Sequence, residues 1–192
     1  MDVVGFIQGL NLFDILVAFF VAGFFVVGYI QGTLRRLLGL AIALVSLLLA
    51  MNLRDPLGSW LATYWYQLPP QYVDMLAFGG SFVVLFLAAS ITAQTFYRKT
   101  TVFTRASAVD EAVGGILGAL QALLLVGALI VILDSYYALN LAPNPNELDL
   151  FRSIFGLYDP SQIAAVFRES LIPLFFALFG WIVPADLAEL FT

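Results

Sequence analysis

The sequence predicts an all-α membrane protein with four transmembrane helices and a C-terminal amphipathic or interfacial helical tail. Of the 192 residues, 62% are hydrophobic and only 11% are charged, whereas a soluble domain carries about 25% charged residues. A chain this short cannot bury so much apolar surface in a single water-exposed core. It also contains apolar segments of about 20 residues, the length that crosses the hydrocarbon core of a bilayer. A very apolar soluble helical protein is the less favoured alternative.

The four apolar segments are expected to be helices, because backbone groups facing lipid must form their hydrogen bonds within the segment. Continuous apolar runs also differ from the alternating pattern of outer-membrane strands. The predicted spans cover about residues 12–30, 37–53, 75–97 and 112–133. They form a four-helix transmembrane domain over residues 1–137. The first span lacks the basic flank of a cleaved signal peptide, so we expect it to be retained.

Basic residues predict the orientation of these spans. Arg35 and Arg36 lie at a predicted tight turn between the first two spans, where they are expected to contact lipid headgroups. Short cytoplasmic loops accumulate Lys and Arg. The loop between the third and fourth spans adds Arg98, Lys99 and Arg105. These two loops are therefore predicted to face the cytoplasm, with both termini on the opposite side.

An aromatic segment, about residues 55–74, is predicted to be the outer loop between the second and third spans. Trp and Tyr favour the membrane interface, where the ring and its polar tip are both accommodated. An interfacial belt is therefore favoured over a ligand-binding aromatic box. Its aromatic residues are Trp60, Tyr64, Trp65, Tyr66 and Tyr72.

Glycines four residues apart predict close helix packing. Gly28 and Gly32 form one pair, and Gly114 and Gly118 form a second. Small residues let membrane helices approach closely. The contact could lie within one chain or between subunits.

Four polar residues in or beside the spans are candidates for a functional role: Asp14, Asp110, Gln121 and Asp134. Ser107 and Asp110 have the spacing of a capping box, so a helix start is favoured over a functional carboxylate. The aspartates Asp14 and Asp134 fall near outer helix ends and not at mid-bilayer, where carboxylates are costly and usually functional.

Residues 138–192 are predicted to form a helical tail at the outer interface. The apolar run Leu171–Val183 is about 13 residues long and contains Pro173, which is short for a membrane span. We expect a helix lying at the interface or packed on the bundle. A fifth, kinked or re-entrant span is the alternative, and it would place the C-terminus inside.

The residue types present make most catalytic chemistry improbable. The sequence has no His and no Cys, which excludes Cys/His zinc sites, cysteine nucleophiles and Ser-His-Asp triads. Lys99 is the only lysine, and no phosphate-binding GxxxxGK[ST] motif occurs. We therefore expect no enzyme activity, no cofactor and no metal. The net charge of −5 also argues against nucleic acid as a partner.

Three blocks and a short tail motif resemble a known family. They are FDILVAFF, YIQGTLRRLLGLAIALVSLLLA, SAVDEAVGGILGALQALLLVGALIVILDSYY and SLIPLF. Their order and spacing are similar to those of the colicin V production protein (CvpA) family of bacterial inner-membrane proteins. Where the family often has charged residues, this chain has Gln31, Arg36, Glu111 and Gln121. If the family's residues at these positions form a charged contact inside its bundle, this chain has rewired that contact.

The resemblance implies a multi-pass protein of the bacterial inner (plasma) membrane, with a role in toxin production or secretion and in the envelope. Two function classes stay open. The favoured class is a non-enzymatic accessory or scaffold factor, whose partners are the lipid bilayer and either further copies of itself or other envelope proteins. The alternative is a small oligomeric transporter or channel for a lipid, peptide or small solute. Its candidate polar residues are Gln31, Ser46, Ser81, Ser90, Thr92, Gln94 and Gln121.

Overall fold

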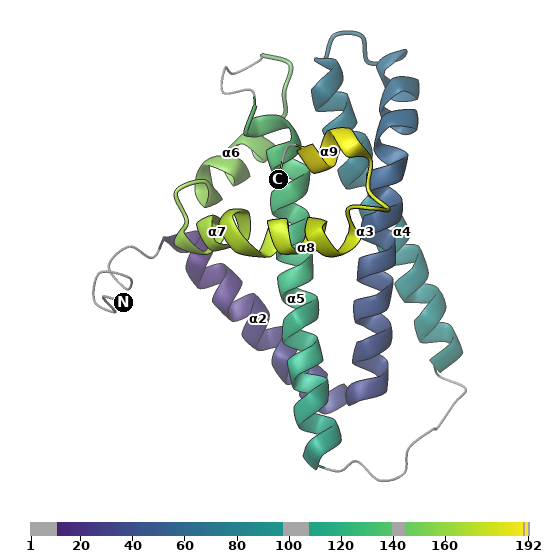
Figure 1. Ribbon diagram of the computed structural model, residues 1–192, viewed down its shortest axis with the longest axis vertical. Coiled ribbons are helices and arrows are strands. Elements are labelled where there is room, and N and C mark those ends of the chain that lie inside the picture. Colours follow the sequence, from purple (N-terminus) through teal and green to yellow (C-terminus); the bar gives the residue numbers. More distant parts are fainter. Residues whose placement is uncertain (1–10, 98–107, 140–144, 190, 192) are drawn as a thin grey trace.

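The computed structural model describes residues 11–97, 108–139, 145–189 and 191, and all regular structure within them is helical (Figure 1). Four long helices are followed by a series of short ones. The long helices are α2 (Leu12–Gln31), α3 (Thr33–Ala62), α4 (Pro70–Tyr97) and α5 (Ala108–Tyr137). The short ones are α6 (Asp149–Tyr158), α7 (Gln162–Val166), the π-helix η1 (Phe167–Leu171), α8 (Ile172–Phe179) and α9 (Ala185–Glu189).

This architecture confirms the predicted all-α membrane class. Five helical runs of the described chain are long and apolar enough to cross a membrane. They are α2, α3, residues Pro70–Ala93 of α4, α5 and the continuous run Gln162–Phe179. Large apolar side chains such as Phe19, Ile30 and Val84 are exposed on the outside of the bundle, as expected where lipid replaces water.

The long helices alternate in direction, so the bundle has two distinct ends. At one end, α2 joins α3 directly, and α5 begins beside this junction (Figure 1). We call this the junction end. At the opposite end, the short helices pack around the second half of α5 (Figure 1). We call this the tail end. Helix α2 packs mainly on α5, while α3 packs on both α4 and α5.

The backbones of α2 and α5 touch at paired glycines. A Cβ atom on Gly28 would lie 2.3 Å from the carbonyl oxygen of Gly114, and one on Gly118 would lie 2.2 Å from that of Phe24. Neither space can hold a methyl group. The glycine contact left open by the sequence therefore lies within the chain, between its first and fourth long helices.

A single residue, Gly32, connects α2 to α3. Its φ angle of 78° lies in the left-handed region, which glycine adopts without the steric penalty of a Cβ atom. Its amide donates to the carbonyl of Gly28 and closes the last turn of α2. The chain therefore reverses with no intervening loop, and any side chain at position 32 would also meet the carboxylate of Asp110.

The second predicted span and the loop after it need correction. Helix α3 continues through Pro56 to Ala62, and α4 already begins at Pro70, so only residues 63–69 separate them. Pro70 is the first residue of α4, a position that proline fits because an N–H there would have no intrahelical partner. Tyr72 is buried against Tyr136 and Tyr137 and so does not belong to the exposed aromatic belt, whereas Trp60, Tyr64 and Tyr66 are exposed.

The C-terminal run Gln162–Phe179 lies across the bundle and not along α5 (Figure 1). Its middle turn widens into the π-helix η1, where the amide of Ile172 donates to the carbonyl of Phe167. Pro173 follows at once, and a proline ring clashes with the backbone of a regular preceding turn. The wider turn is one way to accommodate it. That this run lies along the membrane interface stays a prediction.

The glycine contact can be tested with two alanine substitutions on α2. Gly28→Ala places a methyl group against the α5 backbone, and overpacking of this kind costs about 1–3 kcal/mol. Gly23→Ala is the matched control, because no atom lies within 4 Å of its added Cβ. Thermal unfolding in a mild detergent, followed by tryptophan fluorescence, should show a lower midpoint for Gly28→Ala only. Equal midpoints would contradict the close contact.

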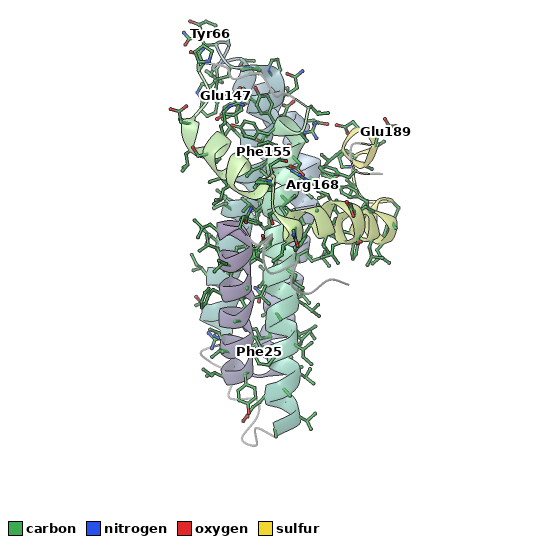
Figure 2. All side chains as sticks on the ribbon, turned by 90° about the vertical axis from the view of Figure 1, so that its left-hand side faces the viewer. Phe25, Tyr66, Glu147, Phe155, Arg168 and Glu189 are labelled. Atoms are coloured by element: carbon green, nitrogen blue, oxygen red, sulfur yellow. The ribbon has the colours of Figure 1, made fainter. Side chains whose placement is uncertain are left out.

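Cysteine labelling can test the placement of the tail, because the native sequence contains no Cys. Single substitutions Arg35→Cys, Tyr66→Cys and Glu189→Cys mark the junction end, the α3–α4 connection and α9. Figure 2 shows Tyr66 and Glu189 toward the same end of the molecule. A membrane-impermeant maleimide should therefore reach positions 66 and 189 from one side and position 35 from the other. Labelling of 189 together with 35 would mean that the tail crosses the membrane.

Candidate functional site

A buried carboxylate on α5 holds the C-terminal run at the tail end. Asp134 accepts two hydrogen bonds from the guanidinium of Arg168, Nε to Oδ2 and Nη2 to Oδ1, each 2.8 Å long. The hydroxyl of Tyr158 donates a third bond of 2.7 Å to Oδ1. This fork geometry gives the strongest form of charged hydrogen bonding between side chains. It fixes η1 and the end of α6 against α5.

Tyr158 keeps its proton in this setting. Burial, followed by the neighbouring Asp134 carboxylate, raises the pKa of Tyr158 far above its ordinary value. Its ring packs on Phe13 of α2 and Phe155 of α6, and the Arg168 guanidinium lies 5.4 Å from the ring centroid. Tyr158 therefore acts as a fixed donor to Asp134.

A second carboxylate, Asp14 at the start of α2, holds the same C-terminal run at another point. Asn11 and Asp14 form a capping box that begins α2. In that box, one carboxylate oxygen of Asp14 accepts from the Asn11 amide. The other oxygen accepts from the Ser161 hydroxyl and from the Ile163 amide. Ser161 in turn caps α7 by accepting from the Ala164 amide. One carboxylate thus satisfies the first turns of two helices, where the positive end of the helix dipole favours negative charge.

A third polar cluster ties α6 to α5 through Glu147. The hydroxyl of Tyr136 donates to Glu147, and Arg152 donates to the same carboxylate at 2.8 Å. The bond to Glu147 raises the pKa of Arg152 above its ordinary value. Nearby, the Leu148 amide donates to the hydroxyl of Tyr72 on α4. The tail is therefore attached to all four long helices, because Asn52 and Arg54 of α3 also donate to Ile182 and Asp186.

At the junction end, Asp110 stabilises the start of a different helix from its own. Its carboxylate accepts from the Thr33 amide, and its backbone carbonyl accepts from the Thr33 hydroxyl. It therefore caps α3 from α5. The capping box expected with Ser107 falls partly outside the described residues.

Gln121, midway along α5, binds one of the two paired arginines. The Nη1 of Arg36 donates to Oε1 of Gln121 at 3.0 Å, and the Arg36 guanidinium lies 5.4 Å from the Phe24 ring. Only 8% of Arg36 is exposed, so its side chain lies inside the bundle, and its expected headgroup contact stays a prediction. The first turn of α3 directs Arg36 into the bundle, whereas Arg35 is exposed. Arg98, Lys99 and Arg105 lie outside the described residues.

The candidate polar residues thus divide between the two ends and do not form one site. Asp14 and Asp134 belong to the tail end, Asp110 belongs to the junction end, and Gln121 lies deeper within the bundle on the same side. No group of three Asp or Glu side chains that could hold a metal ion occurs among the described residues. Sequence reasoning missed the partners Glu147, Tyr158, Ser161 and Arg168, because only the folded tail brings them to the bundle.

The transporter hypothesis depends on other polar side chains, several of which bond to their own helix. The hydroxyls of Ser81 and Thr92 donate to the carbonyls of Phe78 and Ala88. Gln31, Ser90 and Gln121 instead line a common cavity of about 320 Å³ between all four long helices at the junction end. Ser46 is buried, and the side chain of Gln94 is outside the described part of the chain.

Comparison with known sequences identifies the family. The profile of a family described as colicin V production protein matches residues 13–153, which include all four long helices and the start of α6. The chain belongs to the colicin V production protein family. Searches of curated proteins and of solved structures found no match. The family match ends before the second half of α6, so the partners Tyr158, Ser161 and Arg168 lie beyond it.

For this member of the colicin V production family, removing one partner of the charged fork at Asp134 should destabilise the fold. Asp134→Asn removes the buried carboxylate of the two that bind Arg168 and leaves the half-exposed Asp159, and breaking a fully buried pair costs roughly 3–5 kcal/mol. We expect about 2 kcal/mol, because the Arg168 side chain is 29% exposed. Asp186→Asn is the control, since Asp186 is 53% exposed and lies 3.3 Å from Arg54, a contact of about 0–1 kcal/mol. Denaturant unfolding in detergent micelles measures both, and equal losses would refute the ranking.

Proposed function

We propose that this protein is a non-enzymatic accessory or scaffold factor of the bacterial inner membrane, acting in toxin production or secretion and in envelope homeostasis. Membership of the colicin V production family supports the biological setting, and that family is not known as an enzyme family. Residues 1–137 provide the transmembrane domain in this proposal, and residues 138–192 provide a surface beside the membrane.

The observation that carries the proposal is the attachment of the tail by buried carboxylates. Asp14 and Asp134 are the polar residues that could have served chemistry or transport at this end, and both are bonded to tail residues. Ionic bonds of this kind fix geometry more than they add stability. Because the buried carboxylates of this chain position a surface helix, the chain is suited to presenting that surface to another protein.

The exposed surface at the tail end supports the same proposal. Trp60, Tyr64 and Tyr66 are exposed on and after α3, with Tyr66 80% accessible. Trp181, after α8, is 83% accessible. Aromatic side chains with a polar tip are favoured both in protein interfaces and in the headgroup layer. In the proposed orientation, this end faces away from the cytoplasm, and the basic residues near Arg35 face it.

A small oligomeric transporter or channel is the second candidate function. The cavity that brings Gln31, Ser90 and Gln121 together at the junction end favours it. Against it, Arg36 and Gln121 are bonded to each other within that cavity, so any path for a solute would have to displace them.

Site-specific cross-linking in native membranes can test the scaffold proposal. A photoactivatable residue at Tyr66 should give discrete protein adducts, because an accessory factor acts through defined partners. The same residue at Phe19, which is 74% exposed on a long apolar helix, is the control and should give lipid adducts. The opposing result is protein-mediated solute or lipid flux in liposomes that is lost in Gln121→Leu, together with no protein adduct at position 66.

A further inference from the structure

The cavity at the junction end contains a buried cation whose charge has no anionic partner in the described chain. Arg36 bonds to the neutral amide of Gln121 and lies against the ring of Phe24. Its Nε atom is buried and has no hydrogen-bond partner among the described residues. A buried donor without a partner is costly, and more so when it carries charge.

Neighbouring charges increase this demand for an anion. Arg35 is the adjacent residue and lines the same cavity, so two positive charges meet there. No Asp or Glu lines the cavity, and none of the described acidic residues forms an ion pair with Arg36. Asp110 instead bonds to Thr33, and it lies eleven residues before Gln121, about 16 Å along α5.

The shape and lining of the cavity indicate the kind of anion that fits. Its volume of about 320 Å³ lies at the lower end of the range of small-ligand pockets. Arg36 and Gln121 form a buried floor, and the exposed side chains of Gln31 and Arg35 lie at the edge. Apolar walls complete it, from Leu38 and Ile42 of α3 and from Phe86 and Leu87 of α4. A guanidinium matches the oxygen atoms of a phosphate group in fork geometry.

We propose that this cavity is a binding site for a phosphate group, with Arg36 and Arg35 as the charged contacts and Gln121 as the residue that positions Arg36. The phosphate belongs either to the headgroup of an anionic lipid or to a small soluble phosphate. The apolar walls accommodate the glycerol and first acyl carbons in the first case. The site does not depend on the accessory role proposed above.

The test uses the full-length chain purified in a neutral detergent. Native mass spectrometry measures binding of phosphatidylglycerol and of diacylglycerol, which has the acyl chains without the phosphate, and tryptophan-detected melting is followed with inorganic phosphate. Binding of phosphatidylglycerol at least about tenfold tighter than diacylglycerol, the effect of one charged hydrogen bond, identifies a lipid headgroup. A rise in melting temperature with inorganic phosphate identifies a soluble ligand. Equal binding of both lipids without any effect of phosphate overturns the proposal.

Three variants locate the site. Arg36→Gln should weaken the binding of the effective anion by about tenfold or more. Ser90→Phe fills the cavity while keeping Arg36, so it should block binding even if Arg36→Gln fails to fold. Arg54→Gln removes one positive charge near the opposite end and should leave binding unchanged. Undiminished binding in Ser90→Phe, or an equal loss in Arg54→Gln, overturns the assignment to this cavity.

Discussion

The direct backbone contact between α2 and α5 is the constraint on which the rest of the structure depends. Lipid gives little hydrophobic drive for helices to associate, so close packing has to supply the attraction. The glycines at positions 28, 114 and 118 supply it by letting two backbones meet. This contact sets the path of α2, and the path of α2 determines where Asp14 meets the tail and where Gly32 starts α3.

The two ends of the bundle are stabilised in different ways. At the tail end, aromatic side chains and paired carboxylates form a conventional packed core around Tyr137, Tyr158 and Asp134. At the junction end, glycines and the Thr33–Asp110 bonds hold the helices, and a cavity with an unpaired arginine remains. The buried aromatic core is thus concentrated at the end that carries the tail, whereas buried donors without a partner among the described residues occur at both ends, on Arg36 and on Arg54 and Tyr137.

The sequence was sufficient for the class of the protein, its long helices and its family, because each of these depends on local composition or on motif order. Helix ends were less accurate: the second span was predicted to end at about residue 53, yet α3 continues through Pro56 to Ala62. The sequence did not predict contacts between side chains that lie far apart in the chain. Asp134 was a visible candidate, but its partner Arg168 lies 34 residues away on a turn widened next to Pro173. The side chain of Arg36 points into the bundle because of how α3 is rotated about its axis after Gly32. No local sequence pattern predicts that rotation.

The one-residue link at Gly32 joins α2 to α3 with no loop between them. Helix α2 is a rod of 20 residues, about 30 Å long, with Asp14 anchored in the tail at one tip and Gly32 at the other. Arg36 sits one turn beyond that hinge. Because no loop separates the two helices, any change in the angle between α2 and α3 has to be absorbed at Gly32 and its neighbours, one turn from Arg36.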